Sequence, residues 1–325
     1  MNPKQKIAFF GSDEIALPSL EALADSSNNW EICGVLTQPD RRSGRGRILQ
    51  PNAIKRWAMD SHIPVMNPEK PGKVEAEWIK DLGVDLVLVM AYGHILKEDL
   101  LTVTPFGCFN LHASLLPKYR GASPIESAMA MGEMKTGVTL MQVIPEMDAG
   151  PIIDAETVII DQGDTGSLLR AKIAKACVPL IKRNMGALLS DSYVPIDQNE
   201  KEATYCRKLS KIDGRLNFEL SAKQLVSRNL AFSGWPGSYF LHFDQVLKVG
   251  KISEIDGYDH LQPGQRGWED EHSLIIGTRK GAIAVEEIQK PGGKMLPISD
   301  FVRGYSIPKE IRFSSPEDQT ELIRC

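Results

Sequence analysis

Short apolar runs that alternate with helical patterns constrain the first half of this chain more than any other feature. The runs are largely apolar and bounded by Gly or Pro, as is typical of strands buried on both faces of a parallel sheet. The predicted strands cover residues 7–10, 32–36, 86–90 and 108–111, and the predicted helices between them cover 17–23, 53–59 and 74–82. This alternation predicts an α/β fold with a doubly wound, mostly parallel sheet.

The second half of the sequence shows a different pattern of helical and β-like segments. A long helical pattern over 165–190 predicts a helix that packs back on the sheet, and residues 191–206 lose the periodicity, which we interpret as a linker. Beyond it lie one helical pattern and several short β-like runs between Gly, Pro and Asp turns, at 221–231 and at 238–243, 245–250, 273–277 and 282–288. Because 325 residues usually exceed one hydrophobic core, we expect an α/β domain over 1–190 and a small β-domain over 207–325.

Two polar side chains stand at the end of the last predicted parallel strand. Side chains alternate in an extended segment, so Asn110 and His112 point the same way. Asp148 follows the apolar run 138–144 at the expected end of a neighbouring strand, where its carboxylate can meet the imidazole. Taken singly, a histidine at a strand end is more often structural, and an Asp before Ala-Gly is commonly a turn former. The joint spacing has no packing explanation and predicts a site.

The pattern around these residues is Asn-x-His-x-Ser-Leu-Leu-Pro-x-x-Arg-Gly over 110–121, followed by Thr-Gly-Val-Thr at 136–139 and Asp-x-Gly at 148–150. It resembles the formyltransferases that use 10-formyltetrahydrofolate, and among them those that formylate methionyl-tRNA most closely. The likeness extends to Lys-Leu-Ser-Lys at 208–211 and Trp-Pro at 235–236. The resemblance implies a formyltransferase-type sheet domain, an OB-like barrel in the second domain, 10-formyltetrahydrofolate as co-substrate, and no metal.

Formyl transfer to an amine requires attack on a carbonyl, an oxyanion in the tetrahedral intermediate, and protonation of the departing nitrogen. The resemblance implies that Asn110, His112 and Asp148 are the catalytic trio. The Asn110 amide can donate to the oxyanion, His112 can donate to the same oxygen and shuttle a proton, and Asp148 can orient the ring. The incoming amine is itself a nucleophile, so we expect direct transfer without a covalent enzyme intermediate.

Ligands of α/β sheets bind outside the carboxyl ends of the strands, where one predicted strand ends in Met-Ala-Tyr-Gly. The resemblance implies a folate pocket lined by Ala91, Tyr92, Gly93 and Ile95 around the pterin, with a wall of Ser114, Leu115, Leu116 and Pro117. Arg120 with Gly121 could equally form a surface turn with a loosely held guanidinium, so its role stays open. The turn Gly-Ser-Asp at 11–13 lacks the Gly-x-Gly-x-x-Gly pattern, which argues against NAD.

The loop over residues 38–51 places four arginines among glycines, namely Arg41, Arg42, Arg45 and Arg47. Such a run is ordinarily a solvated surface loop, but arginine suits phosphates and stacks on bases. The resemblance favours contact with the acceptor stem of initiator methionyl-tRNA, with Arg45 implicated. Lys208 and Lys211 could contact RNA phosphates or simply be solvated. The nearly neutral charge of the second domain does not favour either interpretation.

Charge and cysteine usage limit the partners and the compartment. The formal net charge of −4 argues against a generally basic nucleic-acid binder, so any RNA contact must be local. The five cysteines are widely spaced without a Cys-x-x-Cys pair, which favours reduced thiols over disulfides or zinc. The sequence shows no signal-peptide stretch and no run of transmembrane length. We therefore expect a cytoplasmic monomer with no membrane partner.

Four other functions remain open from the sequence. An enzyme that formylates an amino-sugar nucleotide would share the central pattern but would not need the arginine loop. Formyl transfer to a purine precursor is disfavoured because those enzymes resemble only the first domain. A folate hydrolase would replace the amine with water. A noncatalytic RNA-binding module would leave Asn110, His112 and Asp148 unexplained.

Overall fold

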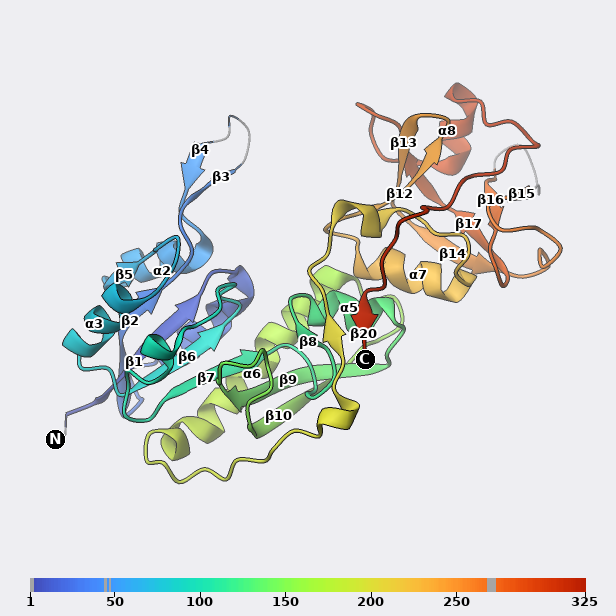
Figure 1. Cartoon of the computed structure of the whole chain (residues 1–325). Helices are drawn as coiled ribbons and strands as arrows, with labels where there is room; N and C mark the ends of the chain where they lie inside the picture. Colours follow the sequence, from blue (N-terminus) through green and yellow to red (C-terminus); the bar gives the residue numbers. More distant parts are fainter. Residues whose placement is uncertain (1–2, 44–45, 47, 268–272) are drawn as a thin grey trace.

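A computed structural model describes residues 3–43, 46, 48–267 and 273–325 (Figure 1). Its first half is built on a seven-stranded sheet in the order β10-β9-β7-β6-β1-β2-β5. The strands are β1 (Gln5–Gly11), β2 (Trp30–Leu36), β5 (Val65–Met66), β6 (Leu86–Met90), β7 (Cys108–His112), β9 (Lys135–Gln142) and β10 (Ile152–Ile159). Strands β5, β2, β1, β6 and β7 are parallel, and β9 and β10 run antiparallel. The predicted doubly wound, mostly parallel sheet is confirmed.

Helices cover both faces of this sheet. They are α1 (Leu17–Leu23), α2 (Ala53–Asp60), α3 (Lys73–Asp81), α4 (Glu98–Leu101), α5 (Pro124–Ala130) and α6 (Gly166–Leu188). Alternation along β1 shows the two layers, because Ile7 and Phe9 join the core under α1, α2 and α6 while Ala8 and Phe10 join the core under α3 and α4. Helix α6 begins where the side chain of Thr165 accepts a hydrogen bond from the Leu168 amide.

The segment expected as a linker is bonded to the first sheet. Ile196 and Ile152 exchange two backbone hydrogen bonds of 2.8 Å. Further on, β11 (Tyr205–Cys206) pairs in parallel with β8 (Arg120–Gly121), directly after the Ser-Leu-Leu-Pro turn. The strand β20 (Ile323–Arg324) pairs antiparallel with β11, so the C-terminal segment returns to the first domain (Figure 1). Three distant parts of the chain therefore meet beside the predicted site.

The second half has its own core, formed by α7 (Ala222–Ala231), α8 (Ile298–Gly304) and two four-stranded antiparallel sheets. The strands are β12 (Ser238–His242), β13 (Gln245–Val249), β14 (Ile252–Ile255), β15 (Arg266–Gly267), β16 (Ile275–Gly277), β17 (Ala282–Val285), β18 (Glu287–Gln289) and β19 (Leu296–Pro297). The predicted run 282–288 contains two strands, β17 and β18. The predicted small β-domain is otherwise confirmed.

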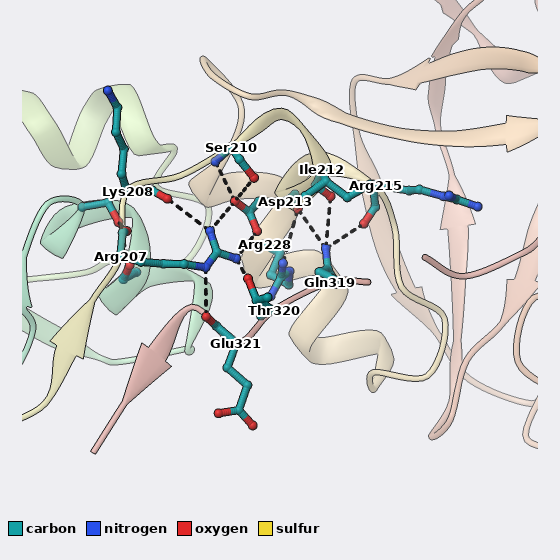
Figure 2. A network of polar contacts seen from close by, with 12 residues as sticks. Arg207, Lys208, Ser210, Ile212, Asp213, Arg215, Arg228, Gln319, Thr320 and Glu321 are labelled. Atoms are coloured by element: carbon teal, nitrogen blue, oxygen red, sulfur yellow. Dashed lines mark hydrogen bonds and ion pairs between the residues drawn. The ribbon is translucent and has the colours of Figure 1, made fainter. Parts of the chain in front are cut away.

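A buried polar cluster lies where the second domain begins (Figure 2). The Asp213 carboxylate, 1% exposed, accepts hydrogen bonds from the Arg207 guanidinium and from the amide and hydroxyl of Ser210. Arg207 also donates to the carbonyls of Thr320 and Glu321 in the C-terminal segment. The cluster thus ties the end of the chain to the start of the second domain.

Candidate active site

Asn110 and His112 occupy the carboxyl end of β7, one face of which is committed to the core. Phe109 and Leu111 are buried in the cluster beneath α6, so the alternation of the strand turns Asn110 and His112 to the other face. Asn110 is half-buried, and its side-chain amide has no hydrogen-bond partner within the described part of the chain. An amide that no neighbour uses is available to a ligand.

Asp148 reaches His112 by a route that the sequence did not predict. Strand β9 runs antiparallel to β7, so its last residue, Gln142, lies beside Phe109 rather than beside His112. The segment 143–150 folds back over this face, and Asp148 adopts the left-handed conformation with φ of 52°. Its Oδ2 lies 3.6 Å from Nδ1 of His112 and accepts a 2.8 Å hydrogen bond from the Gly121 amide.

Both ring nitrogens of His112 face oxygen acceptors. Nε2 lies 2.9 Å from the carbonyl oxygen of Tyr119, while Nδ1 faces Asp148. A neutral ring can donate at only one of these two positions. The 3.6 Å separation exceeds a hydrogen bond, and the side chains of His112 and Asp148 are 6% and 18% exposed.

The residues expected around the pterin follow β6 and are partly engaged in holding the edge of the sheet. Ser12 donates through its amide to the carbonyl of Ala91 and through its hydroxyl to the carbonyl of Tyr92. Gln38 donates to the same Tyr92 carbonyl, whereas Gly93 and Ile95 make no backbone hydrogen bond to any other described residue. Ile95 is 81% exposed.

The Tyr92 phenol lies inside the protein, against Phe10 and His94. Burial raises its pKa, and its hydroxyl has no partner among the described residues. A buried hydroxyl without a partner is uncommon in folded proteins. Burial likewise lowers the pKa of His94, with Arg41 adding to the effect.

The turn over residues 114–117 is fastened to β9 by one hydroxyl. Thr139 Oγ1 donates to the carbonyl of Ser114 and accepts from the amide of Leu116. The hydroxyl of Ser114 donates to the carbonyl of Lys118, closing the turn on itself. With Leu115 packed against Gly137 and Pro117 partly exposed, the polar groups of this turn hold its shape rather than face outward.

Arg120 is fully buried, so a surface turn with a loose guanidinium is the wrong interpretation. The guanidinium donates to both carboxylate oxygens of Glu200, to Oε1 of Gln198 and to the hydroxyl of Tyr205. Bonding to Glu200 raises the pKa of Arg120 above its ordinary value. Glu200 and Gln198 lie in the segment expected as a linker, and nothing in their spacing marked them as partners of the site.

The arginine loop forms a hairpin of β3 (Arg41–Ser43) and β4 (Ile48–Gln50), which projects from the edge of the sheet (Figure 1). Arg41 is exposed and donates to Gln38, and Arg42 is exposed beside it. Arg45 and Arg47 lie outside the described residues. Ile48 and Leu49 in β4 are 62% and 59% exposed, so the hairpin also presents apolar side chains.

The lysines at the domain junction are exposed. The ammonium of Lys208 points away from the polar cluster around Asp213 (Figure 2), and Lys211 starts a short 3-10 helix on the surface. Among the described residues, neither Lys208 nor Lys211 makes a hydrogen bond or ion pair with Asn110, His112 or Asp148.

Within the described ranges, no group of His, Cys, Asp and Glu side chains is arranged to hold a metal ion. No helix in the same part of the chain is long and apolar enough to cross a membrane. The five cysteines are free.

Sequence comparisons match two family models. The model described as Formyl transferase covers residues 5–184, and the one described as Formyl transferase, C-terminal domain covers 208–306. A methionyl-tRNA formyltransferase of Legionella pneumophila (strain Paris) is 36% identical over 297 residues, which is 91% of this chain and 94% of that relative. Another, of Sulfurihydrogenibium sp. (strain YO3AOP1), is 34% identical over 311 residues, or 95% of this chain and 99% of that relative.

Solved structures give the same fold. A sugar 3N-formyl transferase solved with dTDP and 5-N-formyl-THF has a TM-score of 0.65 at 20% identity, covering 89% of this chain and 99% of that chain. An N-formyltransferase from Helicobacter canadensis, solved with folinic acid and dTDP-3-aminofucose, has a TM-score of 0.65 at 22% identity, covering 88% and 100%. At such identities the likeness concerns the fold alone.

Proposed function

The chain belongs to the formyl transferase family, and from this premise we propose that it transfers a formyl group from 10-formyltetrahydrofolate to the α-amino group of methionyl-tRNA. The assignment of the acceptor rests on the likeness to relatives named methionyl-tRNA formyltransferase, which extends over nearly the whole of both chains. The initiator tRNA is the acceptor that fits this activity, since a formylated methionine serves to begin protein synthesis. The proposal includes a cytoplasmic monomer.

The proposed reaction begins when the neutral amine attacks the formyl carbon. A carbon–nitrogen bond forms, and the carbonyl electron pair moves to oxygen to give an oxyanion. The side-chain amide of Asn110 has no other partner in the described structure, which supports its role as donor to this oxygen. A preorganised donor of this kind is worth on the order of 100-fold in rate.

Collapse of the intermediate breaks the bond between the formyl carbon and folate nitrogen, which takes up a proton. The attacking amine loses a proton, so the net transfer is from one nitrogen to the other. His112 can carry this proton at its Nδ1 edge, because Nε2 is bonded to the carbonyl of Tyr119. Asp148, placed 3.6 Å from Nδ1, compensates the charge of the ring while it holds the proton.

We assign the folate pocket to the segments that flank this trio. Ala91, Tyr92, Gly93 and Ile95 would shape the pterin end, with Gly93 and Ile95 supplying unengaged backbone groups. Ser114, Leu115, Leu116 and Pro117 would form the opposite wall, held in place by Thr139. The carboxyl edge of a parallel sheet is where such ligands bind.

We assign recognition of the tRNA acceptor stem to the hairpin of β3 and β4, with Arg41, Arg42, Arg45 and Arg47 facing phosphates. Lys208 and Lys211 would add phosphate contacts at the domain junction, where both are exposed. Because the chain carries a net charge of −4, these local groups must supply the attraction for RNA.

An amino-sugar nucleotide is the second candidate acceptor, because solved structures with this fold include sugar formyltransferases. Their identities of 20% and 22% lie well below the 34% and 36% of the tRNA-acting relatives. The exposed arginine hairpin also favours an acceptor rich in phosphates over a small nucleotide sugar.

The deciding experiment compares formyl incorporation from 10-formyltetrahydrofolate into initiator methionyl-tRNA, elongator methionyl-tRNA and an amino-sugar nucleotide under identical conditions. We expect transfer to the initiator alone. Transfer only to the sugar, or cleavage of the folate without an acceptor, would overturn the proposed acceptor. Folded His112→Ala and Asp148→Ala variants with wild-type turnover would refute the assignment of the trio.

A further inference from the structure

One side chain from the segment after α6 holds the backbone at Asp148 and just after it. Nε2 of Gln198 donates to the carbonyl of Asp148 at 2.8 Å and to the carbonyl of Gly150 at 2.7 Å. The first of these two carbonyls belongs to the residue whose carboxylate faces His112. Gln198 is half-buried, while its neighbour Asn199 is exposed.

The orientation of the Gln198 amide is determined by its partners. Its Oε1 lies 3.1 Å from Nε and 2.8 Å from Nη2 of Arg120, and both of these atoms are donors. Backbone carbonyls can only accept, so the NH2 group must face Asp148 and Gly150. Arg120 therefore sets the direction in which Gln198 donates.

Arg120 is itself held rigidly. It is fully buried, and Glu200 accepts from Nη1 at 2.9 Å and from Nη2 at 2.6 Å. Such a two-point guanidinium–carboxylate pair has a defined geometry. The adjacent Gly121 amide donates to Oδ2 of Asp148, so β8 reaches this aspartate both directly and through Gln198.

The backbone of Asp148 adopts an uncommon conformation that nearby contacts hold. Its φ of 52° lies in the left-handed region, which Asp adopts more readily than most residues other than Gly and Asn. Surrounding contacts decide whether a residue stays in such a sparsely populated region. The two bonds from Gln198 and the one from Gly121 are contacts of this kind.

We propose that Gln198 is a positioning residue of the formyl transfer, fixed by Arg120 and donating to the backbone carbonyls of Asp148 and Gly150 so that the Asp148 carboxylate faces His112. This inference rests on the proposed function for its kinetic consequence, but its structural consequence does not depend on any substrate. Gln198 lies outside the reacting groups, so its loss acts on the rate through Asp148.

The test uses two variants of Gln198 and one matched control in the full chain. Gln198→Ala removes the acceptor for Arg120 and the donor to the carbonyls of Asp148 and Gly150. Gln198→Glu keeps an oxygen for Arg120 and removes only the donor to the two carbonyls. Asn199→Ala removes an amide from the adjacent residue, whose side chain forms hydrogen bonds with Glu202 and Lys201 among the described residues. The measurements are kcat, KM for 10-formyltetrahydrofolate, and exchange of the Gly121 amide hydrogen with solvent.

We expect kcat of both Gln198 variants to fall by roughly 10- to 100-fold, because a small displacement of a positioned group has this effect on rate. KM for 10-formyltetrahydrofolate should stay within about twofold, since the pocket walls are untouched. The Gly121 amide should exchange faster in both variants, because its acceptor is released. Asn199→Ala should match the wild type in all three measurements.

Wild-type kcat in Gln198→Glu, or unchanged exchange at Gly121 in either folded Gln198 variant, would overturn the proposal. If Gln198→Ala does not fold, Gln198→Glu decides alone, because it keeps the bond to Arg120. Absence of formyl transfer by the wild type would overturn the proposed function instead, and the exchange of Gly121 would still decide whether Gln198 holds the turn.

Discussion

At the scale of single residues, two side chains on strand β7 differ in how they are held by their surroundings. His112 is engaged by Tyr119 and Asp148, so its removal disturbs structure and chemistry together. The side chain of Asn110 makes no hydrogen bond within the described structure, although it sits between two fully or nearly fully buried residues. A residue in this position can be changed with little effect on the fold, which makes it the cleanest probe of the chemistry.

We expect Asn110→Ala to lower kcat on the order of 100-fold while the melting temperature stays unchanged, because the variant loses an oxyanion donor but no internal bond. Initial-rate kinetics and thermal unfolding measure the two quantities. Asn28→Ala is the opposite control, since its amide donates to the carbonyls of Ala22 and Leu23 at the end of α1. That variant should lose stability and keep kcat. A normal rate in Asn110→Ala would exclude the amide from the reaction.

At the scale of elements, the turn over residues 114–117 depends on β9 rather than on its own residues. Thr139 lies in β9 opposite His112, and its hydroxyl is the only described side-chain group that bonds both ends of the turn. The same strand accommodates Leu115 at Gly137, where a Cβ would overlap the carbonyl oxygen of Glu156. Strand β9 therefore shapes the assigned pocket wall from behind.

We expect Thr139→Val to destabilise the protein by about 2 kcal/mol, because the Leu116 amide and the Ser114 carbonyl lose their partner inside the protein. The loosened wall should raise KM for 10-formyltetrahydrofolate more than it lowers kcat. Denaturant unfolding and steady-state kinetics supply these values. Thr139→Ser keeps the hydroxyl and should behave nearly as the wild type. An equal loss in both variants would point to the methyl group rather than to the bonds.

The elements were predictable where hydrophobic periodicity alone decides them. Strands β1, β2, β6 and β7 and helix α1 lie within a few residues of their predicted ranges, because each is a continuous or periodic apolar run. The meeting of Asp148 with His112 depends on an antiparallel β9 and a folded-back loop, which spacing does not encode. Gln198 and Glu200 were missed because a polar residue that reaches a buried arginine looks, in sequence, like any linker residue.

At the scale of the whole molecule, the C-terminal segment joins the two domains. Gln319 donates to the carbonyls of Ile212, Asp213 and Arg215 where the second domain begins (Figure 2). A few residues later, β20 pairs with β11, which in turn pairs with β8 in the first domain. One short segment thus contacts both the junction and β11, the strand that pairs with β8 after the assigned pocket wall.

We expect removal of residues 319–325 to lower the melting temperature and to expose the segment around 207–216 to proteases, because the carbonyls and strand edge that this segment covers become open to solvent. Removal of Cys325 alone, which is exposed and lies beyond β20, should have neither effect. Thermal unfolding and limited proteolysis test both. A truncated chain as resistant as the full one would show that the two domains hold together without this segment.

The polar cluster at the same junction makes stability depend on pH. Burial by itself would raise the pKa of Asp213, but the hydrogen bonds from Arg207 and Ser210 outweigh it and hold the pKa below its ordinary value. A carboxylate whose pKa is lowered by folding stabilises the protein above its unfolded pKa, and this contribution is lost as the pH falls through the folded value. We therefore expect this stabilisation to be lost below about pH 4, near the ordinary pKa of an unfolded aspartate.

We expect Asp213→Asn to reduce the free energy of unfolding at pH 7 by about 2 kcal/mol, less than for a fully buried pair because the Arg207 side chain is 24% exposed. The gap between wild type and variant should narrow as the pH falls below about 4, since the wild type then loses the same charge. Urea unfolding at a series of pH values measures this difference in the free energy of unfolding directly. The contributions of the other carboxylates cancel in the difference because both proteins share them. A gap that stays constant down to pH 3 would mean that Asp213 acts through its shape and hydrogen bonds alone, without its charge.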